Sequence, residues 1–251
     1  VTGRPPIEGE WTLHPILDLP EAEAVRRCLG SDGLASLLAE ADEIAAGRAR
    51  LFGAEPVNLR LTFDQPLQHW TAYENHPGLL ASLYNGIPDV KFLWEPARFG
   101  WVFPLGRAYH LSRREAYAEA FWRLAEQFLD ANPPGLGPHW MSAQEVALRL
   151  MAFVWAAQIF AASPASTPAR QIRLGRAVAA HAARIPPTLV YARSQNNNHL
   201  LSEAAGLFTA ALALPDHPAS ARWRRLGWKW LNLGLQTQID GYGEYSQHST
   251  N

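Results

Sequence analysis

The sequence has little of what marks several protein classes. Its 251 residues contain a single cysteine, Cys28, which excludes an intrachain disulfide framework and a zinc site built from several cysteines. No apolar run approaches the roughly 18 residues of a membrane span. The 22 basic and 23 acidic residues nearly cancel, so no global field would draw the chain to nucleic acid or to a membrane. An anionic ligand would therefore need a local basic groove.

What the sequence does have is helical periodicity and ten tryptophans, most of which we expect in a core. Apolar residues recur at helical spacing from residue 98 onward, and Pro- and Gly-rich breaks separate the blocks. The expected helices cover 98–109, 114–131, 143–161, 169–184, 197–214 and 218–238. Helices of this length joined by short loops predict an all-α protein of antiparallel helical hairpins, packed as a bundle, a solenoid or an α/α toroid.

The residues before 89 are less regular. Short helices are expected near 21–28 and 34–46, followed by polar sequence broken by prolines. The start of the chain, residues 1–6, is not a signal peptide, and a removed signal remains compatible with a chain that does not begin with Met. We expect an irregular N-terminal segment, 1–88, packed on a helical domain, 89–251.

The most informative stretch runs from Gln195 to Glu203 and contains three consecutive asparagines. Asparagine favours caps over helix interiors, so the triplet predicts a helix start, whose free N–H groups favour an anion. His199 and Glu203 are four residues apart and share one helix face. They either line a ligand site there or simply form a local pair.

Two clusters precede this stretch. Trp94 and Arg98 flank Glu95 at a helix entry, where an indole can stack on a sugar and a guanidinium can bind a carboxylate; the alternative is an internal Glu95–Arg98 salt bridge. Farther on, His139 and Trp140 stand at a loop-to-helix junction. They line a groove or anchor the core.

The helix after this junction carries its own signals. Ser142 and Glu145 form a capping box, and Glu145 is expected to pair with Arg149 four residues later.

A last cluster lies in residues 240–251, which we expect to form a polar loop. It carries Tyr242, Glu244 and His248, groups that can transfer protons or contact a ligand. The alternative is a terminus without a role.

In combination, the clusters resemble the heparinase II/III-like polysaccharide lyases, specifically their N-terminal α/α-toroid domain. The matching stretches are Lys91-x-x-Trp94-Glu95-x-x-Arg98, Asn132 through His139-Trp140 to Glu145–Arg149, Asn197-Asn198-His199-Leu200-Leu201-Ser202-Glu203-Ala204-Ala205-Gly206-Leu207, and Asp240-Gly241-x-x-Glu244-x-Ser246. They span about residues 89 to 251.

The resemblance implies β-elimination beside a uronic acid in an acidic polysaccharide. Asn198 would hold the uronate carboxylate with help from His199, and Glu203 would orient the pair. The neutralised carboxylate makes the C5 proton acidic enough for a base to remove. The expected substrate contacts are Arg98, Trp94, His139, Trp140, Asn197, Glu244, Tyr242 and His248.

Other implications concern what accompanies the toroid. The family's acid is a tyrosine placed a few residues after Ser246, so we expect this domain to be truncated at its C-terminal end, and the family's C-terminal β-sandwich to be absent from this chain. The elimination requires no cofactor, although a structural divalent cation is compatible with the fold. The substrate class favours a periplasmic or secreted location, and the sequence carries no signal for an oligomeric state.

Two other functions remain open at this point. A glycoside hydrolase on an α/α toroid would use paired carboxylates, such as Glu203 with Glu244 or Asp240. A non-catalytic or degenerate carbohydrate-binding module would use the tryptophans and Arg98 without chemistry. No zinc site is expected, because the spacing of His199, Glu203 and His248 matches no standard zinc motif.

Overall fold

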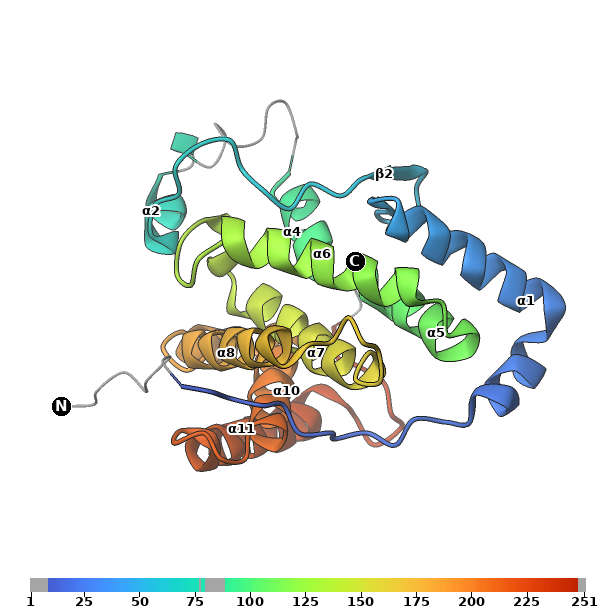
Figure 1. Ribbon diagram of the computed structural model, residues 1–251. Helices are drawn as coiled ribbons and strands as arrows, with labels where there is room; N and C mark the ends of the chain where they lie inside the picture. Colours follow the sequence, from blue (N-terminus) through green and yellow to red (C-terminus); the bar gives the residue numbers. More distant parts are fainter. Residues whose placement is uncertain (1–8, 77, 80–88, 248–251) are drawn as a thin grey trace.

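The computed structural model describes residues 9–76, 78–79 and 89–247, and its elements are predominantly helices (Figure 1). The elements are α1 (Ala22–Ala45), β1 (Arg48–Arg50), β2 (Pro56–Asn58), α2 (Trp70–Asn75), α4 (Lys91–Ala97), α5 (Val102–Ser112), α6 (Glu115–Ala131), the 3-10 helix η1 (Pro138–Trp140), α7 (Ala143–Ile159), α8 (Pro168–Arg184), α9 (Leu189–Gln195), α10 (Asn198–Ala213) and α11 (Ser220–Gln238).

The all-α prediction is confirmed, and the long helices begin and end close to the predicted positions. The expected helix at 98–109 starts later, at Val102, because Phe99 adopts a left-handed conformation with φ 61° and separates α4 from α5. Both short helices expected near the N-terminus are present: they make up α1 and are separated at Gly30, whose φ of 67° and ψ of −179° are not helical. A short antiparallel hairpin of β1 and β2 was not predicted.

Successive long helices pack as antiparallel hairpins. In the pair α7–α8, Arg149 contacts His181 early in α7 and late in α8, and Arg184 at the end of α8 reaches the carbonyl of Met141 before α7. In the pair α10–α11, Gly227 packs beside Ala204 while Gly234, farther along α11, lies beside Leu201, nearer the start of α10. The later helix of each pair therefore runs back along the earlier one.

Neighbouring hairpins pack with their first helices parallel. Gln144 donates to Ser202 at 3.2 Å, and one turn farther Gly206 lies so close to Ala147 that an added Cβ would stand 2.8 Å from the alanine Cβ. Both α7 and α10 therefore begin at the same end of the molecule. The segment before α5 joins them there, because Arg98 bonds Glu145 near the start of α7.

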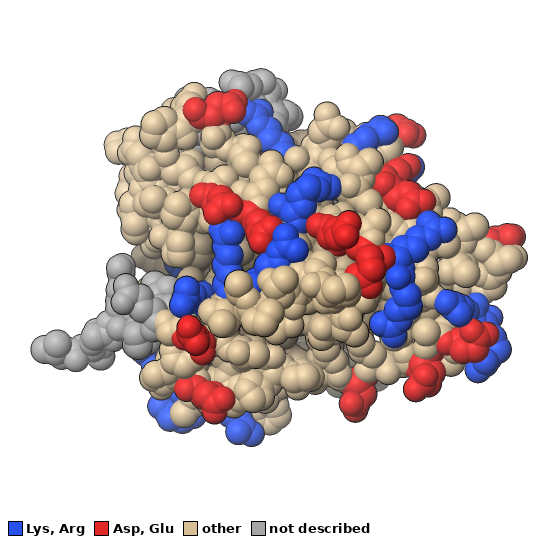
Figure 2. Space-filling model, in the orientation of Figure 1, with Lys and Arg blue, Asp and Glu red and all other residues tan. Residues whose placement is uncertain are grey.

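The second helices form an outer layer joined by ion pairs. Arg170 of α8 bonds Glu126 of α6 at 2.9 Å, and Arg173 pairs with Asp130 one turn along both helices. Basic and acidic side chains alternate over this face in Figure 2. The inner helices begin at the same end of the molecule, and the outer helices run back antiparallel to them. This arrangement is a toroid-like arc.

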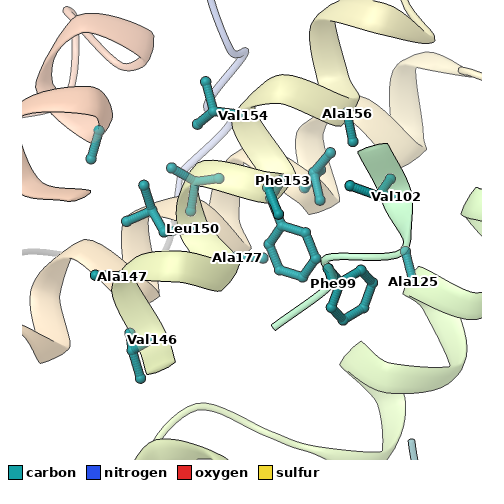
Figure 3. Packing of buried hydrophobic residues seen from close by; sticks show 14 of the residues in the cluster. Phe99, Val102, Ala125, Val146, Ala147, Leu150, Phe153, Val154, Ala156 and Ala177 are labelled. Carbon is teal, nitrogen blue, oxygen red and sulfur yellow. The ribbon is translucent and has the colours of Figure 1, made fainter. Parts of the chain in front are cut away.

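The core lies between the two layers and is rich in aromatic rings. Phe99 meets the rings of Phe128 and Phe153 edge-on, at centroid distances of 5.2 and 4.7 Å. Figure 3 shows Phe99 beside Phe153. Tryptophans contribute as expected: Trp122 and Trp223 are buried, whereas Trp228 is 57% exposed. Burial of this apolar area fixes how the inner helices sit relative to one another.

An extended segment, residues 9–20, crosses α8 and the ends of α7 and α10. His14 donates its backbone N–H to the carbonyl of Ala213 at 2.8 Å, and the N–H of Ile16 bonds the Gln158 side chain at 3.1 Å. Gly175 of α8 allows the close approach, because a Cβ there would lie 1.9 Å from the carbonyl oxygen of Trp11. We refer to residues 9–20 as the strap.

Candidate functional site

The three asparagines have separate backbone roles at the junction of α9 and α10. Asn196 ends α9 in a left-handed conformation with φ 43°, which asparagine tolerates better than most residues. Asn197 caps α10 by accepting the N–H of His199 on its side-chain oxygen at 3.0 Å. Asn198 is then the first residue of the helix. The predicted helix start is confirmed.

Three polar side chains at this helix start leave hydrogen-bonding capacity unused. Within the described residues, no hydrogen bond involves the side chain of Asn198. The only polar contact of the His199 ring there is a 4.0 Å approach of Nδ1 to Glu203 Oε1. Oε2 of Glu203 is buried and has no partner. These groups make the start of α10 a candidate ligand site, because a buried polar atom such as Glu203 Oε2 normally has a partner.

The protonation states of this cluster follow from burial. Glu203 is 3% exposed, and burial raises its pKa to about 8 although the nearby positive charge of Arg184 opposes the shift. Burial also lowers the pKa of His199, against the charge of Glu145. At neutral pH, Glu203 is therefore mostly protonated and His199 neutral, so the two do not form an ion pair.

Arg98 lies beside this cluster but is held by two carboxylates. Its Nε and Nη2 donate to the buried Glu145 at 2.6 and 2.8 Å, and its Nη1 donates to Glu95 at 2.6 Å. The hydrogen bond to Glu145 is the main reason why the Arg98 pKa is raised. The internal Glu95–Arg98 salt bridge is thus present. A role for Arg98 in substrate binding stays a prediction.

The expected pairing of Glu145 with Arg149 is wrong. Arg149 is fully buried and points into the core, where it donates to His181 Nε2 at 2.8 Å and to the carbonyls of Ala97 and His139 at 2.9 and 2.8 Å. Burial lowers the pKa of Arg149 to about 9. A buried guanidinium takes these partners because it must satisfy its donors on several elements at once.

His139 and Trp140 are not exposed to a ligand. They are 1% and 2% exposed, and His139 lies between the rings of Phe63 and Phe128 with both ring nitrogens unpartnered. Burial holds the pKa of His139 well below its usual value. The expectation that these two line a groove is corrected: they anchor the core. Trp94 is half-buried, and its Nε1 donates to the carbonyl of Pro138 at 3.0 Å.

A group of residues that we did not predict braces the asparagine turn. Gln238, 1% exposed, donates from Nε2 to the Asn197 carbonyl at 3.0 Å and to Asn196 Oδ1 at 3.3 Å. Tyr245 donates to Gln238 Oε1 at 3.0 Å. Gln247 Oε1 accepts the backbone N–H of Asn198 at 3.2 Å. The sequence signal was limited to burial: Gln238 continues the buried stripe of α11, but the spacing does not indicate which groups it contacts.

The remaining predicted residues lie in the C-terminal turn. Asp240 accepts the N–H groups of Tyr242 and Glu244 at 2.8 and 3.0 Å, which closes the turn. Tyr242 is 96% exposed and Glu244 is exposed as well. The turn brings neither side chain into a hydrogen bond with Asn198 or His199. His248 lies outside the described residues.

Arg184 is a further residue that sequence reasoning missed. Its Nε and Nη2 donate to the carbonyls of Trp140 and Met141 at 2.9 and 2.6 Å, and its guanidinium lies 3.8 Å from the centroid of the Trp70 ring. Burial lowers its pKa to about 10, so it is charged at neutral pH. It supplies fixed positive charge near Glu203.

No group of three or more His, Cys, Asp or Glu side chains is arranged to hold a metal ion in the part of the chain that the structure describes. Among the described helices, none is both long and apolar enough to cross a bilayer.

The helical arc and the polar cluster at the shared start of its inner helices define an α/α-toroid protein. The family model of the heparinase II/III N-terminus matches residues 68–248, and the chain belongs to this family. Two heparin-sulfate lyases are similar in sequence: that of Bacteroides stercoris is 25% identical over 205 residues, and that of Bacteroides thetaiotaomicron is 26% identical over 156 residues. They match 70% and 61% of this chain.

A solved structure has the same fold. The crystal structure of heparan sulfate lyase HepC from Pedobacter heparinus matches with a TM-score of 0.63 and 21% identity, over 84% of this chain and 30% of that chain. A mutant of the same lyase matches with a TM-score of 0.55 and 22% identity, over 93% of this chain and 40% of that chain. The chain spans only 30% and 22% of the lengths of the two Bacteroides lyases.

Proposed function

We propose that this chain is the toroid part of a polysaccharide lyase that cleaves uronic-acid-containing glycosaminoglycans by β-elimination. The observation that carries the proposal is the unused hydrogen-bonding capacity of Asn198, His199 and Glu203 at the start of α10. The heparin-sulfate lyases among the relatives indicate the substrate class, an acidic glycosaminoglycan.

The chemical demand on such a site is to neutralise the uronate carboxylate. The C5 proton is removable only when negative charge that develops on the carboxylate is stabilised by donors placed for it. The Asn198 amide can donate a hydrogen bond to that group. The N-terminus of α10 adds the positive end of a helix dipole, and Arg184 adds a full charge nearby.

Because Glu203 is mostly protonated, a second carboxylate can bind beside it without charge repulsion. An ionised Glu203 would repel the uronate, but with a pKa of about 8 it is mostly neutral at pH 7 and can itself donate a hydrogen bond. Neutral His199 can accept or donate, depending on its tautomer. The proposal assigns binding and charge neutralisation to these residues, and it assigns proton transfer to neither Tyr242 nor Tyr245.

The test is the Asn198→Ala variant in protein expressed from its complete reading frame. Unsaturated uronate absorbs in the ultraviolet, so elimination on heparan sulfate can be followed directly. We expect a loss of at least about 100-fold in kcat/KM, as for removal of other transition-state donors. Stability should change little, because the side chain makes no hydrogen bond with described residues.

Asn232→Ala is the matched control. Among the described residues, the Asn232 side chain donates only to the carbonyl of Trp228 within its own helix, α11, so its loss should leave elimination unchanged. If wild-type protein yields no unsaturated product from any uronate glycan, or if the two variants lose activity equally, the proposal is wrong. Cleavage without that absorbance would indicate a hydrolase.

A further inference from the structure

A row of basic side chains lies along α11. The helix carries Arg222, Arg224, Arg225 and Lys229 and no acidic residue. Arg222, Arg225 and Lys229 are spaced three and four residues apart, so they share one helix face, and all three are exposed. The opposite face packs on the core through a buried stripe. That stripe consists of Trp223, Gly227, Trp230, Gly234 and Gln238.

A fourth cation joins this row from α9. The Arg193 guanidinium lies 4.0 Å from the centroid of the Trp230 ring, and the Lys229 ammonium lies 4.8 Å from the same ring. One indole thus brings the cations of two helices together. We call Arg193, Arg222, Arg225 and Lys229 the basic row.

The charged groups of the basic row have no carboxylate partner among the described residues, which sets the row apart from the ion-paired arginines of the outer layer. Among the described residues, no ion pair or hydrogen bond involves the charged groups of the basic row. By contrast, Arg50, Arg170 and Arg173 each pair with a carboxylate at 2.5 to 2.9 Å. The acidic residue just before α11, Asp216, lies 3.4 Å from His14. A chain with a formal net charge of −1 therefore concentrates uncompensated positive charge here.

Both helices that carry the basic row end at the asparagine turn of the candidate site. Arg193 lies in α9, which ends at Asn196, and Gln238 at the end of α11 holds the turn that follows. Because a helix rises 1.5 Å per residue, the row on α11 extends from about 14 Å to about 24 Å from Gln238 along the helix axis. Figure 1 shows α11 at the lower edge of the stack of helices.

We propose that the basic row is a second binding surface for a sulfated polysaccharide, separate from the residues that neutralise the uronate. Guanidinium groups bind sulfate and carboxylate groups with paired hydrogen bonds, and a linear polyanion can contact several cations in a row. The choice of this polyanion over others rests on the proposed function. The surface adds affinity for long chains and takes no part in the elimination.

The experiment compares Arg222→Gln/Arg225→Gln/Lys229→Gln with a control of equal charge change. The control is Arg27→Gln/Arg48→Gln/Arg123→Gln, which removes three exposed cations from α1, β1 and α6. Heparin affinity is measured between 50 and 200 mM salt. Removal of three cation contacts should reduce the slope of the logarithm of the binding constant against the logarithm of the salt concentration by about 2. Binding at low salt should weaken on the order of tenfold. The control should change affinity less than about twofold.

Two further measurements separate this surface from the proposed function. The α11 variant should still eliminate a short uronate oligosaccharide at the wild-type rate, and Asn198→Ala should still bind heparin. Equal loss of heparin binding in the α11 variant and the control would overturn the basic row as a specific surface. Wild-type binding of double-stranded DNA or desulfated heparin as tight as that of heparin would overturn its preference for sulfated glycans. Neither result would affect the elimination assay.

Discussion

Glu203 should make the stability of this protein depend on pH in an unusual direction. A carboxyl whose pKa is raised on folding binds its proton more tightly in the folded state, so folding is favoured at low pH and loses that contribution as pH rises. The relevant window runs from the model value of 4.5 to about 8, the pKa of Glu203 in the fold. Glu203→Gln removes the titration and keeps the shape.

The magnitude follows from the two pKa values. Within the window the unfolded carboxyl is ionised and the folded one is protonated, so the free energy of unfolding falls by about 1.4 kcal/mol per pH unit. Between pH 5 and pH 7 the loss is about 2.5 kcal/mol. No discount for solvent screening is needed, because the Glu203 side chain is 4% exposed.

The assay is urea denaturation of both proteins at several pH values from 5 to 8. Wild-type data alone would mix signals, because His139 and His181 have lowered pKa values and stabilise the fold increasingly as pH rises toward 6.5. Subtraction of the Glu203→Gln curve cancels these contributions. A difference curve that is flat from pH 5 to 8 would refute the protonated state of Glu203 and, with it, the way the site accepts a second carboxylate.

Two other predictions concern how the site and the strap are held. Gln238→Leu should cost about 1–3 kcal/mol by removing the hydrogen bonds of Gln238 to the Asn197 carbonyl, Asn196 and Tyr245, and it should lower kcat. Gln236→Leu, on the exposed side of the same helix, is the control, and equal effects of the two would contradict the brace. Gly175→Ala should lower the free energy of unfolding by about 1–3 kcal/mol and make the strap sensitive to proteolysis. Gly33→Ala is the control and should do neither, since its Cβ would meet only Leu29 at 3.4 Å. An intact strap in Gly175→Ala would disprove the close packing.

The helices of the toroid were predictable, because apolar periodicity and proline-rich breaks mark each of them. The short helices α2, α4 and α9 were not, since six or seven residues give too little pattern and depend on packing for stability. The prediction for Glu145 and Arg149 failed for a related reason. Spacing four apart on a helix suggests a pair, but both side chains are buried, where partners from other elements decide.

Part of the candidate site could likewise be predicted from the sequence, and part could not. The helix start at Asn197 and Asn198, and the shared face of His199 and Glu203, could be read from local sequence. The contacts of Gln238 and Arg184 could not, because each joins segments about 40 residues apart in the chain. The elevated pKa of Glu203 is likewise a property of burial, which no spacing rule reports.

The strap has a consequence for the order in which the chain folds. The hydrogen bond from Ile16 to Gln158 joins residues that are 142 positions apart in the sequence. The hydrogen bond of His14 cannot form until Ala213, at the end of α10, is in place. Contacts of such long range form late, because the chain must first be drawn together. We therefore expect substitutions in the strap to speed unfolding and leave the refolding rate nearly unchanged. During synthesis, the strap is made before α7 and α10 and would dock only after both of them have been made.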